Sequence, residues 1–483
     1  MNAHSNDMTT SAMPDLDSLL AAQKAAFAAD RMPSREVRLD RLDRLQNLLL
    51  DNRQALADAI SADFCGRSPV ETDLAEIIPL LEGIKYYRKR LKKLMKPEKR
   101  HASLTVMPAR AEVRYQPKGV VGIVVPWNFP VFLALSPLIG VLAAGNRAML
   151  KMSEFTPRTG ELLGGLLAEK FSDDEVVLVN GDVEVATAFT KLPFDHLVFT
   201  GSTAVGRKVM AAAAENLVPV TLELGGKSPA IIHPDFPMEE AAKRIAFGKV
   251  INAGQICIAP DYILCPRSQV DAFADAFANE VRENYPTYRD NPDYTAIITE
   301  AQRDRLTDWL ADAEAKGARL MRVNPADEDL SGTRKLPVTI ALDVSDDMTI
   351  MQDEIFGPIL PIVPYDTLDE ALAYVNERER PLALYYFDWD KSRADRVLAR
   401  THSGGACIND TLSHVTCDDL PFGGIGPSGI GHYHGEEGYR TFSHAKAVVR
   451  KGRIHATSLI SPPWDGGMVK RLLSFQFKRF KRR

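Results

Sequence analysis

The sequence predicts an α/β protein built on a parallel sheet covered by helices, and three observations lead to this prediction. From residue 118 onward, short apolar runs alternate with segments of helical character, which is the pattern of strands joined by crossover helices. Polar or glycine-containing turns follow these runs, as a ligand site beyond the carboxyl ends of the strands requires. The chain has 483 residues, 45% hydrophobic and 25% charged, so it is a globular protein that can bury more than one core.

The part of the chain before this alternation is predicted to be mostly helical. Residues 15–62 carry apolar side chains at helical spacing, and Ser34 is placed to cap one of these helices. Residues 77–97 continue the helical pattern and end in a basic run. Residues 103–117 then alternate between apolar and polar side chains, which predicts strands with a turn near Pro108.

The predicted parallel strands are short and apolar, and they lie at residues 120–125, 147–151, 176–179 and 196–200. The turns that follow them are Pro126-Trp127-Asn128, Lys151-Met152-Ser153-Glu154, Asn180-Gly181 and Gly201-Ser202-Thr203. Because the carboxyl ends of parallel strands meet at one edge of a sheet, these turns predict a nucleotide site. A second α/β region runs from about residue 225 to residue 425.

Composition excludes several classes of protein. The net charge of −5 gives no overall signal for nucleic-acid binding, and five cysteines, an odd number, favour free thiols in a reducing cytoplasm. Residues 1–14 are polar and lack the apolar centre of a secretory signal. The long apolar stretch from Val120 to Gly145 is interrupted by Pro126, Pro130 and Pro137, so a buried strand followed by a buried helix explains it better than a membrane span.

Cys257 and Glu223 are the candidate nucleophile and base. Cys257 ends the run Asn252-Ala253-Gly254-Gln255-Ile256-Cys257, and Glu223 lies within Leu222-Glu223-Leu224-Gly225-Gly226-Lys227. A thiolate attacks carbonyl carbons well, and a nearby carboxylate can activate water to release the product. The alternative for an isolated cysteine in an apolar run is a small buried hydrophobic side chain.

Asn128 is the candidate oxyanion donor. Its amide lies where a helix begins, and Pro130 suits the first turn of that helix. An asparagine donor aimed at a developing alkoxide is a common oxyanion stabiliser. The alternative is that Asn128 caps the helix.

Three further groups of residues are candidates for binding a nucleotide. Gly201, Ser202 and Gly206 span a strand-to-helix turn whose amides could hold a phosphate, although the turn lacks the usual dinucleotide spacing and could be an ordinary turn. Lys151 and Glu154 could bind ribose hydroxyls; the alternative is a solvated helix start that Ser153 caps.

The third group is Glu354 and Phe356, which could bind a ribose and pack on a nicotinamide; alone, their segment reads as a turn. No metal site is predicted. Cys407, His414 and Cys417 fall in one segment and His432 and His434 in another, but neither has a reliable ligand spacing.

Together these motifs resemble the aldehyde dehydrogenase superfamily over roughly residues 15 to 455. The motifs occur in the family's order, and they are Pro126 to Pro130, Phe199 to Gly206, Leu222 to Lys227, Gly254 to Cys257 and Glu354 to Pro358. The segment from Pro421 to His444 looks like the class-3 branch, and the run from Asn252 to Tyr262, with that from Asn291 to Thr295, is similar to bacterial coniferyl aldehyde dehydrogenases. Met152, where the family commonly has proline, is a mild departure.

The resemblance implies an aldehyde dehydrogenase-like α/β fold in three parts. A nicotinamide-binding domain would comprise residues 1–102 and 118–224, a catalytic domain residues 225–425, and a small bridging sheet residues 103–117 and 441–455. It also implies a cytoplasmic homodimer that oxidises an aldehyde to a carboxylic acid with NAD, or with NADP as an alternative.

The resemblance also implies the role of each candidate residue. Cys257 would form a thiohemiacetal and then a thioester, Asn128 would hold the oxyanion, and Glu223 would activate water. Lys151 and Glu154 would hold the adenosine ribose, Ser202 a phosphate and Glu354 the nicotinamide ribose. The remaining cofactor contacts would come from Pro126, Trp127, Gly201, Gly206, Leu224 and Phe356. Ile256 and Ile258, beside the nucleophile, suggest an apolar mouth for aromatic aldehydes such as coniferyl aldehyde, or for long-chain ones.

Two other functions remain open from the sequence. A CoA-acylating dehydrogenase shares the fold and the cysteine, but Glu223 favours hydrolysis of the thioester. A non-catalytic protein of the same fold is the other, and the presence of Cys257, Glu223 and Asn128 argues against it.

The chain ends in a basic tail at residues 468–483. From Lys470 to Arg483 it carries basic residues mixed with phenylalanine and leucine and no acidic residue. Such a segment can make weak contact with an anionic membrane surface, and it is too short and too charged to span a bilayer. The alternatives are a solvated end or a segment folded against a partner subunit.

Overall fold

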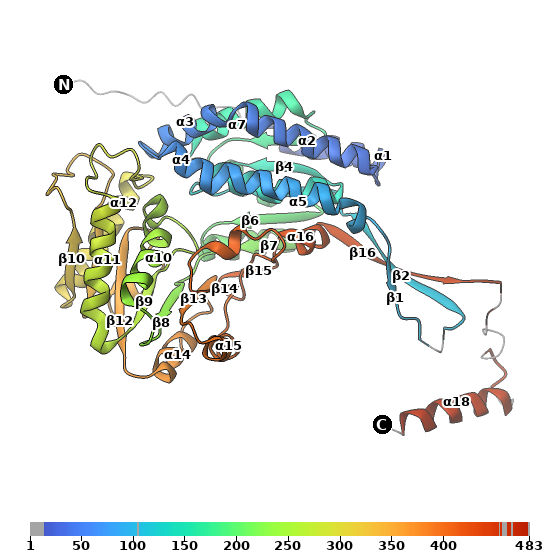
Figure 1. The fold of residues 1–483 in the computed structure, drawn as a ribbon. Coiled ribbons are helices and arrows are strands. Elements are labelled where there is room, and N and C mark those ends of the chain that lie inside the picture. The colour runs from blue at the N-terminus through green and yellow to red at the C-terminus, as the bar shows by residue number, and fades with distance from the viewer. Residues whose placement is uncertain (1–13, 104–105, 454, 456–460, 465–466, 482–483) are drawn as a thin grey trace.

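The structure is a computed structural model that describes residues 14–103, 106–453, 455, 461–464 and 467–481. It contains two large sheets and one small sheet (Figure 1). The predicted α/β fold class is therefore confirmed: both large sheets consist mainly of parallel strands, and the small sheet is antiparallel.

The first sheet has six strands in the order β15-β7-β6-β3-β4-β5. Their bounds are β3 Val120–Val124, β4 Arg147–Lys151, β5 Val176–Val179, β6 His196–Thr200, β7 Val220–Glu223 and β15 Gly429–Ile430. All pairs are parallel except β15 with β7. The four predicted strands are confirmed to within a residue. β7 and β15 were not predicted, because the residues of β7, Val220–Glu223, form no continuous apolar run and β15 has only two residues.

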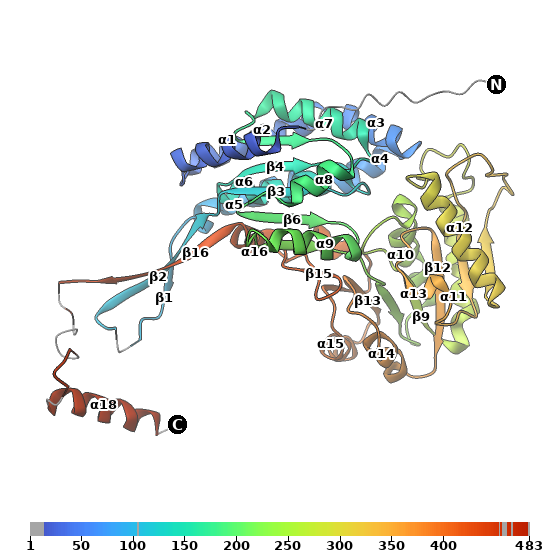
Figure 2. The same cartoon turned by 180° about the vertical axis from the view of Figure 1, so that it is seen from behind.

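Helices cover both faces of the first sheet (Figures 1 and 2). One buried cluster joins one face of the sheet to α1 Leu16–Ala29, α8 Val183–Thr190 and α9 Thr203–Ala214. The opposite cluster joins the other face to α2 Arg35–Asp51, α3 Arg53–Phe64, α5 Ile78–Leu94, α6 Pro130–Ala144 and α7 Pro157–Lys170. Successive residues of β3 point to opposite clusters, since Val120 belongs to the first and Val121 to the second.

The long apolar stretch forms a buried strand and a buried helix, as predicted. β3 is followed by α6, in which every side chain except that of Ser136 is buried. The helix packs between β3 and β4 on one side and α2 and α5 on the other. Among the described residues, no helix is both long and apolar enough to cross a membrane.

The predicted helical region at residues 15–62 forms three separate helices. Asp30 and Asn52 end α1 and α2, and the predicted cap at Ser34 is confirmed, because its hydroxyl accepts a hydrogen bond from the amide of Val37. A short helix α4 at Pro69–Thr72 and a π-helical turn at Asp73–Ile77 then lead directly into α5.

The second large sheet has seven strands in the order β10-β11-β12-β9-β8-β13-β14, and only β10 and β11 pair antiparallel. The strands are β8 Pro229–Ile232, β9 Tyr262–Pro266, β10 Arg319–Val323, β11 Val338–Leu342, β12 Ile359–Tyr365, β13 Ala383–Phe387 and β14 Gly405–Ile408. The helices of this region are α10 Met238–Val250, α11 Val270–Asn284, α12 Glu300–Ala315, α13 Thr349–Gln352, α14 Leu368–Asn376 and α15 Lys391–Arg400.

The small sheet projects away from both large sheets (Figures 1 and 2). It consists of β1 Glu98–Arg100, β2 Ala109–Pro117 and β16 Ser443–Lys451, and β16 pairs with β2 along its whole length. The strand predicted from residue 103 begins only at Ala109, because the described residues from 106 to 108 form a turn; Leu104 lies outside the described residues. α16 Gly435–Thr441 precedes β16, and α18 Gly467–Phe480 lies beyond the sheet.

Candidate active site

Cys257 is presented by a tight turn between α10 and β9. Asn252 and Ala253 have positive φ angles of 51° and 50°, and Gly254 has a φ of 75°. A side chain at Gly254 would overlap the carbonyl of Gly357, so this position requires glycine. Strained backbone of this kind is maintained only where the surroundings fix it. Packing and hydrogen bonds therefore fix the position of Cys257, because the backbone of this turn would not favour these φ angles on its own.

The side chain of Gln255 supplies much of that fixation. It is fully buried, donates to the carbonyls of Asn252 (3.0 Å) and Ala296 (3.1 Å), and accepts from the amide of Ile298 (3.0 Å). Asn252 and Gln255 stand in the motif that identified Cys257, but the sequence analysis gave them no role. A buried polar side chain with no catalytic function of its own carries no local sequence signal.

Asn128 lies beside this turn. Its Nδ2 donates to the carbonyl of Gln255 at 3.2 Å, and Asn252 Nδ2 donates to the carbonyl of Asn128 at 3.1 Å. The alternative that Asn128 caps α6 is wrong, because the cap position is Phe129 and the Asn128 amide donates to Gln255 instead. Asn128 is instead turned toward the segment that carries Cys257.

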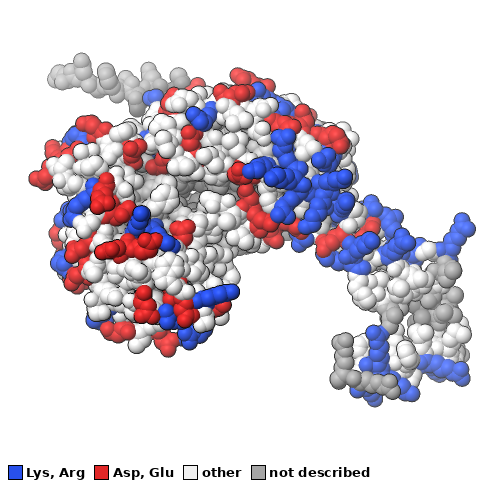
Figure 3. Space-filling view, in the orientation of Figure 1, with Lys and Arg blue, Asp and Glu red and all other residues white. Residues whose placement is uncertain are grey.

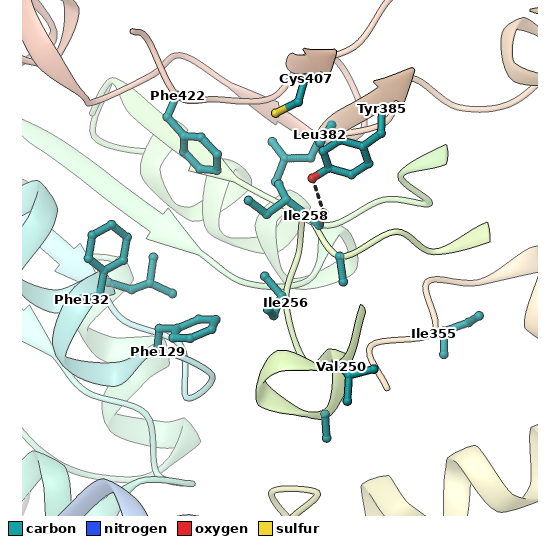
Figure 4. Packing of buried hydrophobic residues seen from close by; sticks show 14 of the residues in the cluster. Phe129, Phe132, Val250, Ile256, Ile258, Ile355, Leu382, Tyr385, Cys407 and Phe422 are labelled. Atoms are coloured by element: carbon teal, nitrogen blue, oxygen red, sulfur yellow. Dashed lines mark hydrogen bonds between the residues drawn. The ribbon is translucent and has the colours of Figure 1, made fainter. Parts of the chain in front are cut away.

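Cys257 and Asn128 line the same small cavity of about 150 Å³. Its wall is almost entirely apolar; the remaining lining residues are Leu74, Ala75, Pro79, Phe129, Phe132, Leu133, Phe247, Ile251, Ile256, Ile258, Leu412, Val415, Thr416 and Phe422. Figure 4 shows three of these aromatic rings, from Phe129, Phe132 and Phe422, around the Ile256–Ile258 segment. An apolar cavity that ends at a thiol suits a substrate with an apolar body and one reactive polar end.

Glu223 is the last residue of β7 and is almost completely buried, with 2% of its surface exposed. Neither carboxyl oxygen has a hydrogen-bond partner among the described residues. Burial raises the pKa of this carboxyl well above its ordinary value. A carboxyl that is buried and unpaired, close enough to Cys257 to affect its ionisation, fits a proton acceptor more than a structural role.

The thiol of Cys257 is also shifted toward its protonated form. Burial raises the pKa of Cys257 above its ordinary value, and the carboxyls of Glu354 and Glu223 raise it further. The thiol is consequently neutral near pH 7 in the structure as described. Attack by sulfur therefore requires a group that removes its proton.

A second, larger cleft of about 930 Å³ is lined by residues of both large regions. It brings together residues that are far apart in the sequence, including Ser202 from the first region and Gly225 and Glu354 from the second. Ser202 also caps α9, since its hydroxyl accepts from the amide of Val205. Gly201 precedes this cap, and Gly206 packs against Leu224. Four residues predicted to bind the cofactor therefore lie around the start of α9, namely Gly201, Ser202, Gly206 and Leu224.

Glu354 lies over Gly225. A side chain at Gly225 would overlap the Glu354 carboxylate and displace it, so glycine allows this close approach. One oxygen of Glu354 is buried without a partner. Burial and the Asp261 charge raise the pKa of Glu354 to about 8, against the amide of Gly226 and the charges of Lys227 and Arg305, which lower it. Gly225 was quoted within its motif but not predicted as a site residue.

The aromatic rings of Trp127 and Phe356 are in contact. Their rings are 5.3 Å apart and nearly perpendicular, and Phe356 has a positive φ of 52°. Pro126 leads directly into Trp127 at the carboxyl end of β3, where the sequence predicted ligand contacts. The structure thus joins two predicted cofactor residues from different regions in one aromatic contact.

Lys151 and Glu154 follow β4. Lys151 is buried and its Nζ donates to the carbonyls of Met152 (2.6 Å) and Gly181 (2.8 Å), whereas Glu154 is exposed. Burial lowers the pKa of Lys151, and the Glu154 charge opposes this. The alternative of a helix start capped by Ser153 is wrong, since α7 begins at Pro157 after Thr156. Neither residue lines the large cleft.

The cysteine and histidine segments show no metal geometry. Within the described ranges, no group of three His, Cys, Asp or Glu side chains could hold a metal ion. Cys407 lies 3.0 Å from Nδ1 of His414, and the ring of His434 stacks on that of Phe422. All five cysteines are free.

Comparisons with known proteins agree on one family. The model of the "Aldehyde dehydrogenase family" matches residues 4–448. A protein of Pseudomonas aeruginosa described as a probable coniferyl aldehyde dehydrogenase is 56% identical, covering 96% of each chain. The substrate-bound structure of Staphylococcus aureus AldH has a TM-score of 0.89 and 37% identity over 95% of this chain and 99% of that one. An aldehyde dehydrogenase of Mycobacterium tuberculosis in complex with NAD+ has a TM-score of 0.80 and 33% identity over 90% and 89%.

The chain therefore belongs to the aldehyde dehydrogenase family. It has the fold of that family, and the resemblance stated from the sequence motifs is confirmed. Proteins of this family oxidise aldehydes to acids with a nicotinamide cofactor, so the chain is an NAD(P)-dependent aldehyde dehydrogenase.

The raised pKa of Cys257 leads to a pH prediction. Because the thiol keeps its proton, alkylation of Cys257 by iodoacetamide without cofactor should still rise steeply with pH above about 9.5, where an ordinary thiol is almost fully ionised and its rate has levelled off. Peptide mass spectrometry measures the rate at Cys257, with exposed Cys65 as the internal control. A Cys257 rate that levels off at or below pH about 9.5 would contradict the raised pKa.

Proposed function

We propose that the protein oxidises an apolar aldehyde, aromatic such as coniferyl aldehyde or long-chain, to its carboxylic acid with NAD. The observation that carries this proposal is the shared cavity: Cys257 and Asn128 line one small apolar space. The Pseudomonas aeruginosa relative supports the aromatic class, as do the rings of Phe129, Phe132 and Phe422 in the cavity wall.

The proposed chemistry begins at the thiol of Cys257. Its sulfur forms a bond to the aldehyde carbon while the thiol proton leaves to a solvent water, and the carbonyl oxygen becomes an oxyanion. The free hydrogen of the Asn128 amide and the backbone amide of Cys257 donate to that oxygen. A bound nicotinamide would supply the acceptor for the hydride of the same carbon, and Cys257 would then hold the acyl group as a thioester.

Glu223 completes the reaction as the general base. Its buried carboxylate removes a proton from water, the hydroxyl adds to the thioester carbon, and the carbon–sulfur bond breaks to release the acid and restore the thiolate. A raised pKa suits this role, because a stronger base takes the proton more readily once it is ionised. This carboxylate is also the reason to favour hydrolysis over transfer to CoA.

The large cleft fits a dinucleotide. Glu354 has a buried oxygen without a partner, and its place over Gly225 forms a cradle that a larger residue would fill. Glu354 would hold the nicotinamide ribose, with Phe356 and Trp127 beside it, and Ser202 a phosphate at the start of α9. Lys151 and Glu154 would hold the adenosine ribose. Further contacts would come from Pro126, Gly201, Gly206 and Leu224.

Three broader proposals accompany this function. The division into functional parts follows the sheets, with cofactor binding in residues 1–102 and 118–224, catalysis in 225–425 and bridging in 103–117 and 441–455. The chain forms a homodimer, since β16 leaves a nine-residue edge that a partner would protect. The protein works in the cytoplasm, consistent with its free cysteines.

We also propose that α18 makes weak contact with anionic membrane surfaces. Its apolar side chains are exposed, among them Phe475, Phe477 and Phe480, and Lys and Arg alternate with them. Figure 3 shows basic residues gathered on α18 and again near the small sheet, where α5 carries an exposed run of them. An amphipathic basic helix with no acidic residue suits an anionic surface.

The function is tested first by substrate turnover. The purified protein should reduce NAD with coniferyl aldehyde or with long-chain aldehydes, giving the free acid at a rate that CoA does not change. Cys257→Ser should abolish turnover while keeping the affinity for NAD, because a hydroxyl is far less nucleophilic than a thiolate. Turnover of the serine variant within tenfold of the parent would exclude Cys257 as the nucleophile.

Replacing the proposed base should separate the two halves of the reaction. Glu223→Gln keeps the shape of the side chain but cannot accept the proton of water. Rapid mixing should show a burst of NADH followed by a slow steady state, at least about tenfold below the parent. An unchanged steady state would place the base at another residue.

The cofactor preference depends on Glu154. Its charge should repel the extra phosphate of NADP, so the parent should prefer NAD and Glu154→Ser should raise the catalytic efficiency with NADP. Initial rates with both cofactors measure this. Equal efficiency of the parent with the two cofactors would count against the proposed place of Glu154.

Membrane contact is measured by co-sedimentation with vesicles of anionic or neutral lipid. The full chain should pellet with anionic vesicles more than a chain that ends at Gly467, and neutral vesicles should retain little of either. A full-length Phe475→Ser/Phe477→Ser/Phe480→Ser variant keeps every positive charge and should bind more weakly. Equal pelleting of the full and shortened chains would remove α18 from any membrane role.

A further inference from the structure

Arg67 is a buried cation outside the catalytic residues described above. It lies in the connection between α3 and α4 with 1% of its surface exposed. Its guanidinium donates to the carboxylates of Glu71 (3.1 Å) and Glu76 (2.9 Å) and to the backbone carbonyl of Asn128 (3.2 Å). It also packs over the ring of Phe129 at 4.7 Å. Taking a guanidinium out of water is costly, so the contacts it makes are specific.

The Glu76 side of this cluster fixes the start of α6. The second oxygen of Glu76 accepts hydrogen bonds from the amides of Val131 and Phe132, each at 2.8 Å. These amides belong to the first turn of the helix, where the backbone has no partner of its own and favours negative charge. Arg67 and Glu76 thus hold the helix that follows Asn128 directly.

The Glu71 side reaches the segment that carries the nucleophile. Glu71 accepts from the hydroxyl of Thr295 at 3.1 Å, and the backbone amide of Asn252, the first positive-φ residue of the turn before Cys257, faces Glu71 closely enough to oppose the rise that burial causes in the pKa of its carboxyl. Asn252 in turn donates to the carbonyl of Asn128. That carbonyl therefore has two donors, one from Arg67 and one from the turn.

The side chain of Asn128 is constrained at the same time. Its amide has two hydrogens, and one is occupied by the carbonyl of Gln255. The other hydrogen remains to donate to an oxyanion. Both the backbone and the side chain of Asn128 are consequently fixed relative to the turn that precedes Cys257.

We propose that Arg67 is a positioning residue: with Glu71 and Glu76 as its anchors, it sets the place of the Asn128 amide relative to Cys257. This inference rests on the proposed role of Asn128 as an oxyanion donor. Lysine at position 67 would keep the charge, but a single ammonium cannot reproduce the planar fork that reaches two carboxylates and a carbonyl. A displacement of the amide by about 1 Å lowers the rate of a positioned reaction by up to about a hundredfold.

The test is a double-mutant cycle on the full-length enzyme with NAD and an accepted aldehyde. Arg67→Lys should lower kcat by at least about tenfold with little change in the KM for NAD. In an Asn128→Ala background the same change should alter kcat less than about twofold, because the amide it positions is gone. The cycle therefore measures coupling, which a purely structural arginine would lack.

Arg38→Lys is the matched control. Arg38 is equally buried and holds the other end of α6, where its guanidinium donates to the carbonyls of Ala143 (3.1 Å) and Ala144 (2.8 Å). This substitution should lower the midpoint of thermal unfolding and leave kcat near that of the parent. A comparable fall in kcat for Arg38→Lys would show that general loosening of α6 explains the effect.

If the losses in kcat caused by Arg67→Lys and by Asn128→Ala are additive in the double variant, the proposal is wrong. If Arg67→Lys does not fold, Glu71→Gln takes its place in the same cycle, since it removes one anchor and leaves Arg67 paired with Glu76. The turnover of the parent enzyme and the fall in kcat caused by Asn128→Ala test the proposed function. The role of Arg67 is tested only by how much the effect of Arg67→Lys on kcat differs between the parent and the Asn128→Ala enzyme. The two failures are therefore distinguishable.

Discussion

Two hydrogen bonds between Asn128 and the turn before Cys257 join the two large regions of the chain at the reacting groups. Asn128 donates to the carbonyl of Gln255, and Asn252 donates to the carbonyl of Asn128. The turn itself holds consecutive positive φ angles, which the backbone would not adopt alone. The placement of a thiol and an amide beside one apolar cavity depends on this contact, and the cavity depends on α6 beginning at Pro130, with only Phe129 between it and Asn128.

Desolvation governs the chemistry of the site. Glu223 is buried and Cys257 and Glu354 are partly buried, and loss of contact with water raises the pKa of each. Neutral groups cost far less to remove from water than charged ones, so the site favours the protonated forms at rest. The same burial means that proton removal must be coupled to binding, because a thiolate beside two carboxylates would be poorly tolerated. A site of this kind is protected from unproductive reaction until the substrate and cofactor occupy it.

The sequence predicted the candidate reacting residues but not the residues that hold them in place. The alternation of strands and helices predicted β3 to β6, since apolar runs bounded by turns carry a strong local signal. β7 was missed because Val220-Thr221-Leu222-Glu223 alternates apolar and polar residues and forms no continuous apolar run such as that of β5, although Glu223 at its end was predicted as a candidate base. Arg67, Glu71 and Glu76 were also missed. Charged residues near a helix read as surface positions, and their burial depends on partners distant in the chain, such as Thr295.

The central claim is that Cys257 carries the acyl group between oxidation and hydrolysis. Acid quenching of the Glu223→Gln enzyme within the first turnover, followed by peptide mass spectrometry, measures that group directly. The account predicts the mass of one acyl group, bound as an acid-stable thioester, on the peptide that contains Cys257 and on none of the peptides with Cys65, Cys265, Cys407 or Cys417. An acyl group on another residue, or formation of NADH with no acyl-enzyme at all, would contradict it.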